Sequence, residues 1–370
     1  MAAYDPRAAL AWLGHYPPLP PGGRVALVGG VVRDAFLGQG PRELDLVIEG
    51  DAAAYARRLP AAAVTVHDAF GTATAEGDGW RVDVAMARRE RYPQPGALPV
   101  VEPATIEEDL ARRDFTVNAI AVTLEGALLG AENALEDLAA RRLRVLHDRS
   151  FIDDPTRVMR LARYAERLRF EVEPHTAELA TVAELETLSG GRLGAELRLA
   201  LCEPDPVAVL GRLAAKLPIA LDRDLIAAAL ALAPADADRA LVVLAALTDD
   251  DGWLERLEFT AAERAVVRAA ANAPAPATDT PSAIWRAWHG LPVEAVALAG
   301  AGGVAGAARR WIGELRHIAL EISGDDLIAA GIAEGPEIGR RLRRTLERRL
   351  DGELAAGPAA ELAAALEGES

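Results

Sequence analysis

The sequence predicts an α+β protein in which a mixed α/β region comes first and an all-helical region follows. Short β-branched runs separated by glycine turns fill residues 1 to about 148, a pattern typical of strands alternating with turns and helices. From about residue 150, alanine, leucine and arginine recur at helical spacing. The change in composition near Asp148 marks the main boundary, and a softer one lies near Pro204. A chain of 370 residues is long enough for two or three domains.

Six runs in the first region are predicted strands, because each is short, rich in apolar residues and bounded by turn residues. They are VALVGG (25–30), ELDLVIEG (43–50), AAVTVH (62–67), WRVDVAMA (80–87), AIAVTL (119–124) and LRVL (143–146). The second region is predicted to be helical throughout, with breaks at residues 203–206, at Pro218, through residues 271–281 and at Gly302-Gly303.

Charge and cysteine content limit the class of protein. A net charge of −16 argues against a general polyanion binder, because the field of the whole molecule would repel RNA. A single cysteine, Cys202, excludes an internal disulfide framework and a cysteine-based zinc site. No window has the length and apolar character of a membrane span, so we expect a cytosolic protein with no membrane partner.

Any contact with RNA must therefore come from local groups of arginines. Such groups occur at 112–113, 141–144, 157–163 and 340–344. The last of these is better explained as a solvated helix face than as a binding surface.

A first candidate site lies where a predicted strand, Val25–Val28, runs through Gly29 and Gly30 into a helix that begins near Val31. Free backbone N–H groups and the helix dipole at such a turn point at one spot and form an anion site. Arg33, one turn inside the helix, would add a fixed cation. A pair of glycines is more often only a tight turn, so this feature alone does not decide the function.

A pair of carboxylates follows in the next predicted strand. Glu43 and Asp45 are two residues apart, so both side chains project from the same face of the strand and repel each other. Mg²⁺ ions that bridge a triphosphate would relieve this repulsion. Asp83, in the strand at 80–87, would complete a three-carboxylate metal cluster. The alternative is that these acids are exposed on an edge strand.

A second candidate site lies between residues 107 and 119. Arg112 and Arg113 would clamp phosphates, and Asp114 or Asn118 would hydrogen-bond a ribose hydroxyl. Capping of a short helix by Asp114 or Thr116 explains the same residues about as well.

A third candidate site lies at the start of the helical region. Asp154 is the predicted N-cap of a helix with Pro155 at its first position. Arg157, Arg160 and Arg163 recur every third residue and form a stripe around this helix. Arg157 and an acid together would read a base edge, and the other two arginines would hold phosphate. Arg163 is rotated by about half a turn from Asp154.

Five segments in this order resemble the class II tRNA nucleotidyltransferases, a family of CCA-adding enzymes, their CC-adding and A-adding relatives and bacterial poly(A) polymerases. The segments are GGVVRDAFLG (29–38) with ELD (43–45), ARRDFTVNAIA (111–121), ALEDLAARRLRVL (134–146), FIDDPTRVMRLARYAERLRF (151–170) and GRLGAELRLAL (191–201). With the stretches between them they cover roughly the first 210 residues. The resemblance implies a polymerase β-like nucleotidyltransferase head at 1–148, a helical neck at 149–210, and a tRNA-binding body and tail at 211–370.

The resemblance also implies roles for individual residues. Those matching the triphosphate-binding positions are Gly29, Gly30 and Arg33, and those matching the metal-binding acidic pair are Glu43 and Asp45. Arg113 and Asp114 match positions that contact ribose and phosphate. Asp154 and Arg157 match the protein template that reads the base. Arg160 and Arg163 match nearby nucleotide contacts.

The implied reaction is attack of the 3′-hydroxyl of tRNA on the α-phosphate of ATP, with Mg²⁺ held by Glu43 and Asp45. Asp83 would orient or deprotonate that hydroxyl. No nucleic-acid template and no protein partner is implied.

The sequence departs from the family pattern at three places. Glu43 stands where Asp is usual, Asp153 stands where Glu is usual, and residues 132–134 lack the usual glycine pair. The stretches 46–52, 87–103 and 153–157 look closest to A-adding members. We therefore expect addition of A, from ATP, to tRNA that ends in CC.

Three alternatives remain open. A full CCA-adding enzyme would use CTP as well as ATP. A poly(A) polymerase would typically need an extended basic tail, whereas this sequence ends in the acidic AAALEGES. A non-catalytic nucleotide-binding or RNA-binding module would bind ATP without turnover, and the departure at Glu43 keeps it under consideration.

Overall fold

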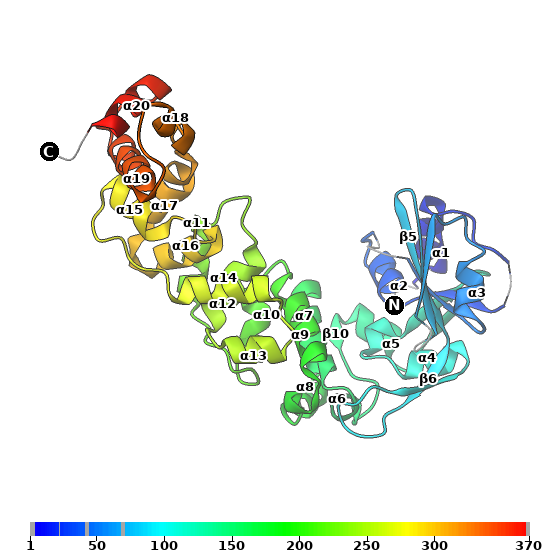
Figure 1. The fold of residues 1–370 in the computed structure, drawn as a ribbon. Helices are drawn as coiled ribbons and strands as arrows, with labels where there is room; N and C mark the ends of the chain where they lie inside the picture. The colour runs from blue at the N-terminus through cyan, green and yellow to red at the C-terminus, as the bar shows by residue number, and fades with distance from the viewer. Residues whose placement is uncertain (1–3, 22, 41–43, 68–70, 368–370) are drawn as a thin grey trace. The chain divides into compact units, whose positions relative to one another are not determined.

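The structure, a computed structural model, describes residues 4–21, 23–40, 44–67 and 71–367. The chain divides into two compact units, Met1–Asp205 and Pro206–Ser370, which we treat separately. The first unit contains the sheet and the second is built from helices (Figure 1). The predicted α+β class is therefore confirmed.

The first unit is built on a seven-stranded sheet in the order β3-β4-β5-β2-β1-β8-β9. Its strands are β1 (Val25–Val28), β2 (Leu44–Ile48), β3 (Ala63–His67), β4 (Thr72–Gly77), β5 (Trp80–Met86), β8 (Ile120–Thr123) and β9 (Leu128–Gly130). Of the described neighbouring pairs, β2 and β5 run parallel and the others run antiparallel. A separate ribbon pairs β6 (Arg88–Arg91) with β7 (Val100–Pro103).

Five of the six predicted strands are confirmed as β1, β2, β3, β5 and β8, and the one predicted at 143–146 is confirmed only at its start. Only β10 (Arg142–Leu143) forms there, parallel to β11 (Glu171–Val172). Beyond it Val145 forms only an isolated antiparallel bridge with Phe115, and its N–H donates to the Thr176 hydroxyl at 3.2 Å, so no continuous strand forms. Four strands, β4, β6, β7 and β9, are not predicted by the sequence, because they lack the long β-branched runs of the others.

Nine α-helices lie in the described residues of the first unit. They are α1 (Pro6–Leu10), α2 (Gly30–Phe36), α3 (Ala52–Ala56), α4 (Ile106–Ala111), α5 (Ala134–Ala139), α6 (Ser150–Asp153), α7 (Thr156–Leu168), α8 (Pro174–Thr181) and α9 (Gly190–Leu201). Helix α7 begins one residue later than predicted, with Pro155 as its N-cap residue. The Asp154 carboxylate still accepts the Thr156 N–H at 3.1 Å, so it stabilises the first turn as expected.

One face of the sheet packs against helix α4. Ile106 and Leu110 of this helix form a buried cluster with Ala26, Val28 and other small apolar residues of the sheet. Val47 of β2 belongs to the same cluster, and side chains alternate along a strand, so Asp45 projects toward this face. The packing of α4 therefore brings the residues that follow it close to Asp45.

The second unit consists of eleven α-helices in the described residues. They are α10 (Pro206–Leu213), α11 (Arg223–Leu232), α12 (Arg239–Leu247), α13 (Asp251–Arg256), α14 (Ala261–Ala271), α15 (Pro281–Trp288), α16 (Val293–Ala299), α17 (Ala305–Gly313), α18 (Gly324–Ala329), α19 (Pro336–Leu350) and α20 (Pro358–Leu366). A cluster that includes the buried Trp288 and Trp311 forms a core among them. No single described helix is both long and apolar enough to cross a bilayer; only the bent pair Pro281–Trp288 and Val293–His317 passes that test together.

The arginines at 340–344 lie on α19. Arg340 is 67% exposed and pairs with Glu337 at 2.7 Å, as the interpretation of a solvated face requires. Arg341 is different, because its guanidinium is only 15% exposed and donates to the Ala365 carbonyl at the end of α20 at 2.9 Å. Arg341 therefore fastens α20 to α19 and is not part of a solvated surface.

Candidate active site

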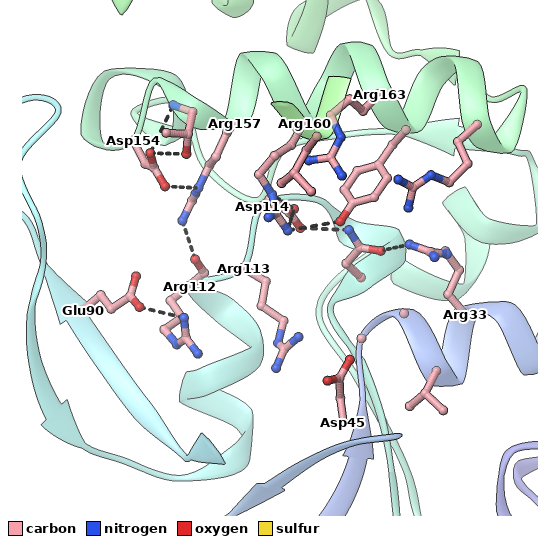
Figure 2. A pocket seen from close by; sticks show the side chains of 18 of the residues that line it. Arg33, Asp45, Glu90, Arg112, Arg113, Asp114, Asp154, Arg157, Arg160 and Arg163 are labelled. Atoms are coloured by element: carbon pink, nitrogen blue, oxygen red, sulfur yellow. Dashed lines mark hydrogen bonds and ion pairs between the residues drawn. The ribbon is translucent and has the colours of Figure 1, made fainter. Parts of the chain in front are cut away.

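A cavity of about 670 Å³ lies in the first unit, between the sheet and helix α7 (Figure 2). Among the described residues, eight arginines and five carboxylates line it. The arginines are Arg33, Arg88, Arg112, Arg113, Arg157, Arg160, Arg163 and Arg167. The carboxylates are Asp34, Asp45, Glu90, Asp114 and Asp154. The excess of positive side chains suits a polyanion, although the chain as a whole carries a net charge of −16.

The Gly29-Gly30 turn forms one wall of the cavity. Gly29 has a φ of +72°, a conformation that glycine adopts without the strain that a Cβ atom would cause. Its N–H donates to the Ile120 carbonyl at 3.0 Å, and helix α2 begins at the next residue. Gly29, Gly30 and Val31 all line the cavity, so the start of α2 faces it.

A chain of hydrogen bonds connects α2 to α7 across the cavity. Arg33 is 4% exposed and donates to the Asn118 side-chain oxygen at 2.5 Å. The Asn118 amide then donates to Asp114 at 2.9 Å, and Asp114 accepts from Arg160 at 2.8 Å. Figure 2 shows Asp114 beside Arg160, with Arg33 on the far side of the same cavity. The expectation that Asp114 or Thr116 caps a short helix is wrong, since the short 3-10 turn Thr116–Asn118 has no side-chain cap.

Asp114 remains ionised although it is buried. Its burial alone would raise its pKa, but the ion pair with Arg160, the hydrogen bond from Asn118 and the charge of Arg157 together lower the pKa to about 2. Asp114 is therefore a fixed negative charge in a site made mostly of arginines, able to accept a hydrogen bond from a hydroxyl.

Two aspartates lie side by side on the face of the sheet against which α4 packs. Asp45 of β2 and Asp83 of β5 are register partners on parallel strands, so their side chains project from the same face. Asp45 lines the cavity, whereas Asp83 is not among its lining residues. Asp83 instead accepts from the Thr74 hydroxyl at 2.5 Å and pairs with Arg81 at 3.2 Å. The predicted metal ligand Glu43 lies outside the described residues.

The described carboxylates suit a hard divalent cation such as Mg²⁺. No three described His, Cys, Asp or Glu side chains gather into a metal cluster. Mg²⁺, however, is commonly held by one or two carboxylates together with the phosphates of a bound substrate. The chemistry of the oxygen donors at Asp45 and its neighbour Asp83 therefore fits such an ion, provided that a polyphosphate binds beside it.

Arg113 follows helix α4 and lies over the glycine turn, between Asp45 and Asp114 in Figure 2. A Cβ atom built on Gly29 would lie 2.7 Å from Nη1 of Arg113. The close approach of this arginine therefore needs a residue without a side chain at position 29.

Replacement of Gly29 by alanine is expected to displace Arg113 and to strain the backbone, because both the Cβ contact and the positive φ oppose it. We expect a loss of about 1 kcal/mol or more in the free energy of unfolding. Chemical denaturation measures this. Gly79→Ala, at a φ of +75° with no atom within 4 Å of its Cβ, is the matched control for the backbone strain. Equal losses in the two variants would contradict a contribution from the Arg113 contact.

Asp154 and Arg157 lie together at another part of the cavity. The Arg157 side chain is 6% exposed, and its Nε lies 4.0 Å from the Asp154 carboxylate. Its terminal nitrogens donate to the Ser150 hydroxyl at 2.7 Å and to the Arg112 carbonyl at 2.6 Å. These contacts hold the guanidinium rigidly.

Arg163 lines the cavity but pairs with acids from the end of the first unit. It donates to Glu196 at 2.8 Å and to Glu203 at 2.9 Å. Its neighbour Arg160 faces Asp114 instead. The structure thus brings all three arginines of the predicted stripe to one cavity, each with different partners.

Sequence reasoning missed several residues of the site. Tyr164 lines the cavity, and the guanidinium carbons of Arg33, Arg160 and Arg167 lie 5.5 to 5.9 Å from the centre of its ring. Its spacing of four residues from Arg160 on α7 was the available signal. Arg192 of α9 donates to Asp154 at 2.7 Å and to the Gly96 carbonyl at 2.6 Å. Nothing in the local pattern indicated that contact.

Comparison with known proteins identifies related sequences. The profile of the poly A polymerase head domain matches residues 25–144. An A-adding tRNA nucleotidyltransferase of Geobacter sulfurreducens is 33% identical over 90% of this chain and 44% of its own length. An A-adding enzyme of Aquifex aeolicus is 44% identical over 49% of this chain and 23% of its own length. A CC-adding enzyme of Deinococcus radiodurans is 46% identical over 50% of this chain and 52% of its own length. The chain thus spans about half or less of these curated relatives.

Solved structures of similar proteins match nearly the whole chain. A CCA-adding enzyme in an apo form superposes with a TM-score of 0.79 at 30% identity, covering 92% of this chain and 90% of that one. The Thermotoga maritima CCA-adding enzyme in complex with tRNA superposes with a TM-score of 0.74 at 29% identity, covering 93% and 90%.

Proposed function

Because the chain belongs to the tRNA nucleotidyltransferase and poly(A) polymerase family, we propose that it transfers adenosine monophosphate from ATP to the 3′ end of a tRNA that ends in CC. The observation that carries this proposal is the single cavity shared by the start of α2, the Asp45 carboxylate and the arginines of α7. A nucleotide needs all three: an anion site for its phosphates, oxygen ligands for a metal, and donors and acceptors for its sugar and base.

The triphosphate would bind at the glycine turn. Gly29 and Gly30 allow phosphate oxygens to approach the backbone N–H groups at the start of α2, and Arg33 and Arg113 add positive charge on either side. Asp114, kept ionised by Arg160, would accept a hydrogen bond from a ribose hydroxyl.

The base would be read by side chains of the protein. Asp154 supplies acceptors and Arg157 supplies donors, and the contacts that hold both side chains reduce the entropy lost when a base binds. Arg160 and Arg163 would lie close to the bound nucleotide, each held by an acid.

We assign the metal site to Glu43 and Asp45, with Mg²⁺ as the expected ion. Such an ion would lower the pKa of the attacking hydroxyl and neutralise the charge that develops on the pyrophosphate. The tRNA 3′-oxygen then forms a bond to the α-phosphorus of ATP as the bond from that phosphorus to the bridging oxygen breaks, which releases pyrophosphate. Asp83, in register with Asp45, would orient the hydroxyl or accept its proton.

The tRNA would contact the helical regions, which we divide as proposed above into a neck at 149–210 and a body and tail at 211–370. We also propose that this activity takes place in the cytoplasm.

Full CCA addition is the second candidate, because CCA-adding enzymes superpose on more than nine-tenths of this chain. Two tRNA substrates distinguish the candidates, one ending in CC and one lacking all three terminal nucleotides, each incubated with labelled ATP or labelled CTP. We expect one adenosine on the tRNA ending in CC and no incorporation of CTP. Incorporation of CTP into the shorter tRNA would instead support CC or CCA addition. Long adenosine tails would support a poly(A) polymerase, and ATP binding without turnover a binding module.

A further inference from the structure

The two adjacent arginines at the end of α4 have different surroundings. Arg112 uses all three of its side-chain nitrogens on acids: Nε and Nη2 donate to Asp109 at 2.9 and 2.7 Å, and Nη1 donates to Glu90 at 2.7 Å. Arg112 thus links α4 to the β6–β7 ribbon. Each nitrogen of its guanidinium therefore already bonds an acid, and these bonds fix its position.

Arg113 is held at a single point. Its Nη2 donates to Asp109 at 3.0 Å, and this is its one side-chain hydrogen bond in the described part of the chain. Its Nε is buried without a partner, and its Nη1 lies beside Gly29. Asp109 therefore determines where the free edge of this guanidinium points.

Asp109 itself is completely buried, with 0% exposure. It lies in the first turn of α4, which a capping box of Thr105 and Glu108 fixes at its start. One carboxylate oxygen receives both bonds from Arg112 and the Arg88 N–H at 3.3 Å, and the other receives Arg113. Burial would raise its pKa, but the charges of Arg113 and Arg112 outweigh that effect and lower it, so the group stays ionised.

We propose that Asp109 is a positioning residue for the triphosphate of the nucleotide. It separates the roles of the two arginines: it keeps Arg112 in the link to Glu90 and turns the free nitrogen of Arg113 toward the Gly29 turn. This inference rests on the proposed function, because it assumes that the phosphates bind at that turn.

The test is a double-mutant cycle with Asp109→Asn and Arg113→Ala. Asparagine keeps the size of the side chain but places an amide, without charge, against two guanidinium groups. We expect the KM for ATP to rise about tenfold or more in Asp109→Asn, as when one oriented charged hydrogen bond is lost. In the Arg113→Ala background the same replacement should change the KM by less than about twofold, because Asp109 acts through Arg113.

Two further variants keep the proposal falsifiable if Asp109→Asn does not fold. Arg113→Lys keeps the charge, but a lysine lacks the planar guanidinium that bonds Asp109 and a phosphate at the same time. We therefore expect a similar rise in the KM for ATP. Glu107→Gln is the matched control, since it removes an acid from the same helix that pairs with Arg24 at 2.7 Å and does not line the cavity. Its KM should stay at the wild-type value.

Binding of ATP in the absence of tRNA, measured by calorimetry, separates this inference from the proposed function. Wild-type protein that does not bind ATP contradicts the proposed function. If the wild type binds and turns over ATP, three results would each overturn the role of Asp109 and leave the proposed function standing. They are an unchanged KM in folded Asp109→Asn, additive effects in the double-mutant cycle, and a wild-type KM in Arg113→Lys.

Discussion

Replacement of Asp45 by asparagine is expected to abolish almost all transfer of adenosine, with a fall in kcat of about 10³-fold, or roughly 4 kcal/mol of transition-state stabilisation. Asp45 is the one carboxylate of β2 in the described residues, and it projects into the cavity beside the start of α2. The amide keeps the shape of the side chain but removes the negative charge that a divalent ion requires. ATP binding should weaken much less than kcat falls, because the arginines of the cavity remain.

The measurement is single-turnover incorporation of labelled ATP into tRNA ending in CC, over a range of Mg²⁺ concentrations. Asp78→Asn is the matched control, because Asp78 is exposed in the turn between β4 and β5 and lies outside the cavity. Activity of Asp45→Asn within a few-fold of the wild type would refute the assignment of the metal site.

Replacement of Asp114 by alanine is expected to lower the free energy of unfolding by about 2 kcal/mol, because it removes a buried partner from Arg160, whose side chain is 36% exposed, and from Asn118. Asp114 is 7% exposed and accepts from both Arg160 and Asn118. The variant also interrupts the connection from α2 to α7. We therefore expect the loss in stability to come with a loss of nucleotide binding.

The same group predicts a dependence of stability on pH. The pKa of Asp114 is about 2 in the folded chain against an ordinary value of 3.8, so the ionised form stabilises the native state above about pH 4. That contribution is lost as the pH falls from about 4 to about 2. Denaturant unfolding at pH 7, 4 and 2.5 measures it in the wild type and in Asp114→Ala, with Asp78→Ala as control. If the difference in the free energy of unfolding between wild type and Asp114→Ala stays the same over this pH range, the ion pair does not contribute to stability.

The sequence predicted much of the fold because its signals are local. A strand such as Val25–Val28 and a helix such as Thr156–Leu168 each follow from the spacing of apolar residues and from the residues at their ends. The segment at 143–146 shows the limit of this reasoning. Its apolar run favours one strand, but its backbone bonds are divided among Val172 of β11, a bridge with Phe115 and the Thr176 hydroxyl.

By itself the sequence determined the α+β class, most of the strands and the family, and it singled out the glycine turn, the acids and the arginines as candidates for the site. Those features depend on neighbours a few positions apart and on an ordered set of segments. Only the tertiary structure decided how the charged groups are paired. Asp114 meets Arg160 across 46 residues and Arg163 meets Glu203 across 40. All three guanidinium nitrogens of Arg112 bond acids, whereas only one nitrogen of Arg113 does. The reason is that an ion pair depends on which elements pack together, and residue spacing along the chain carries no record of that.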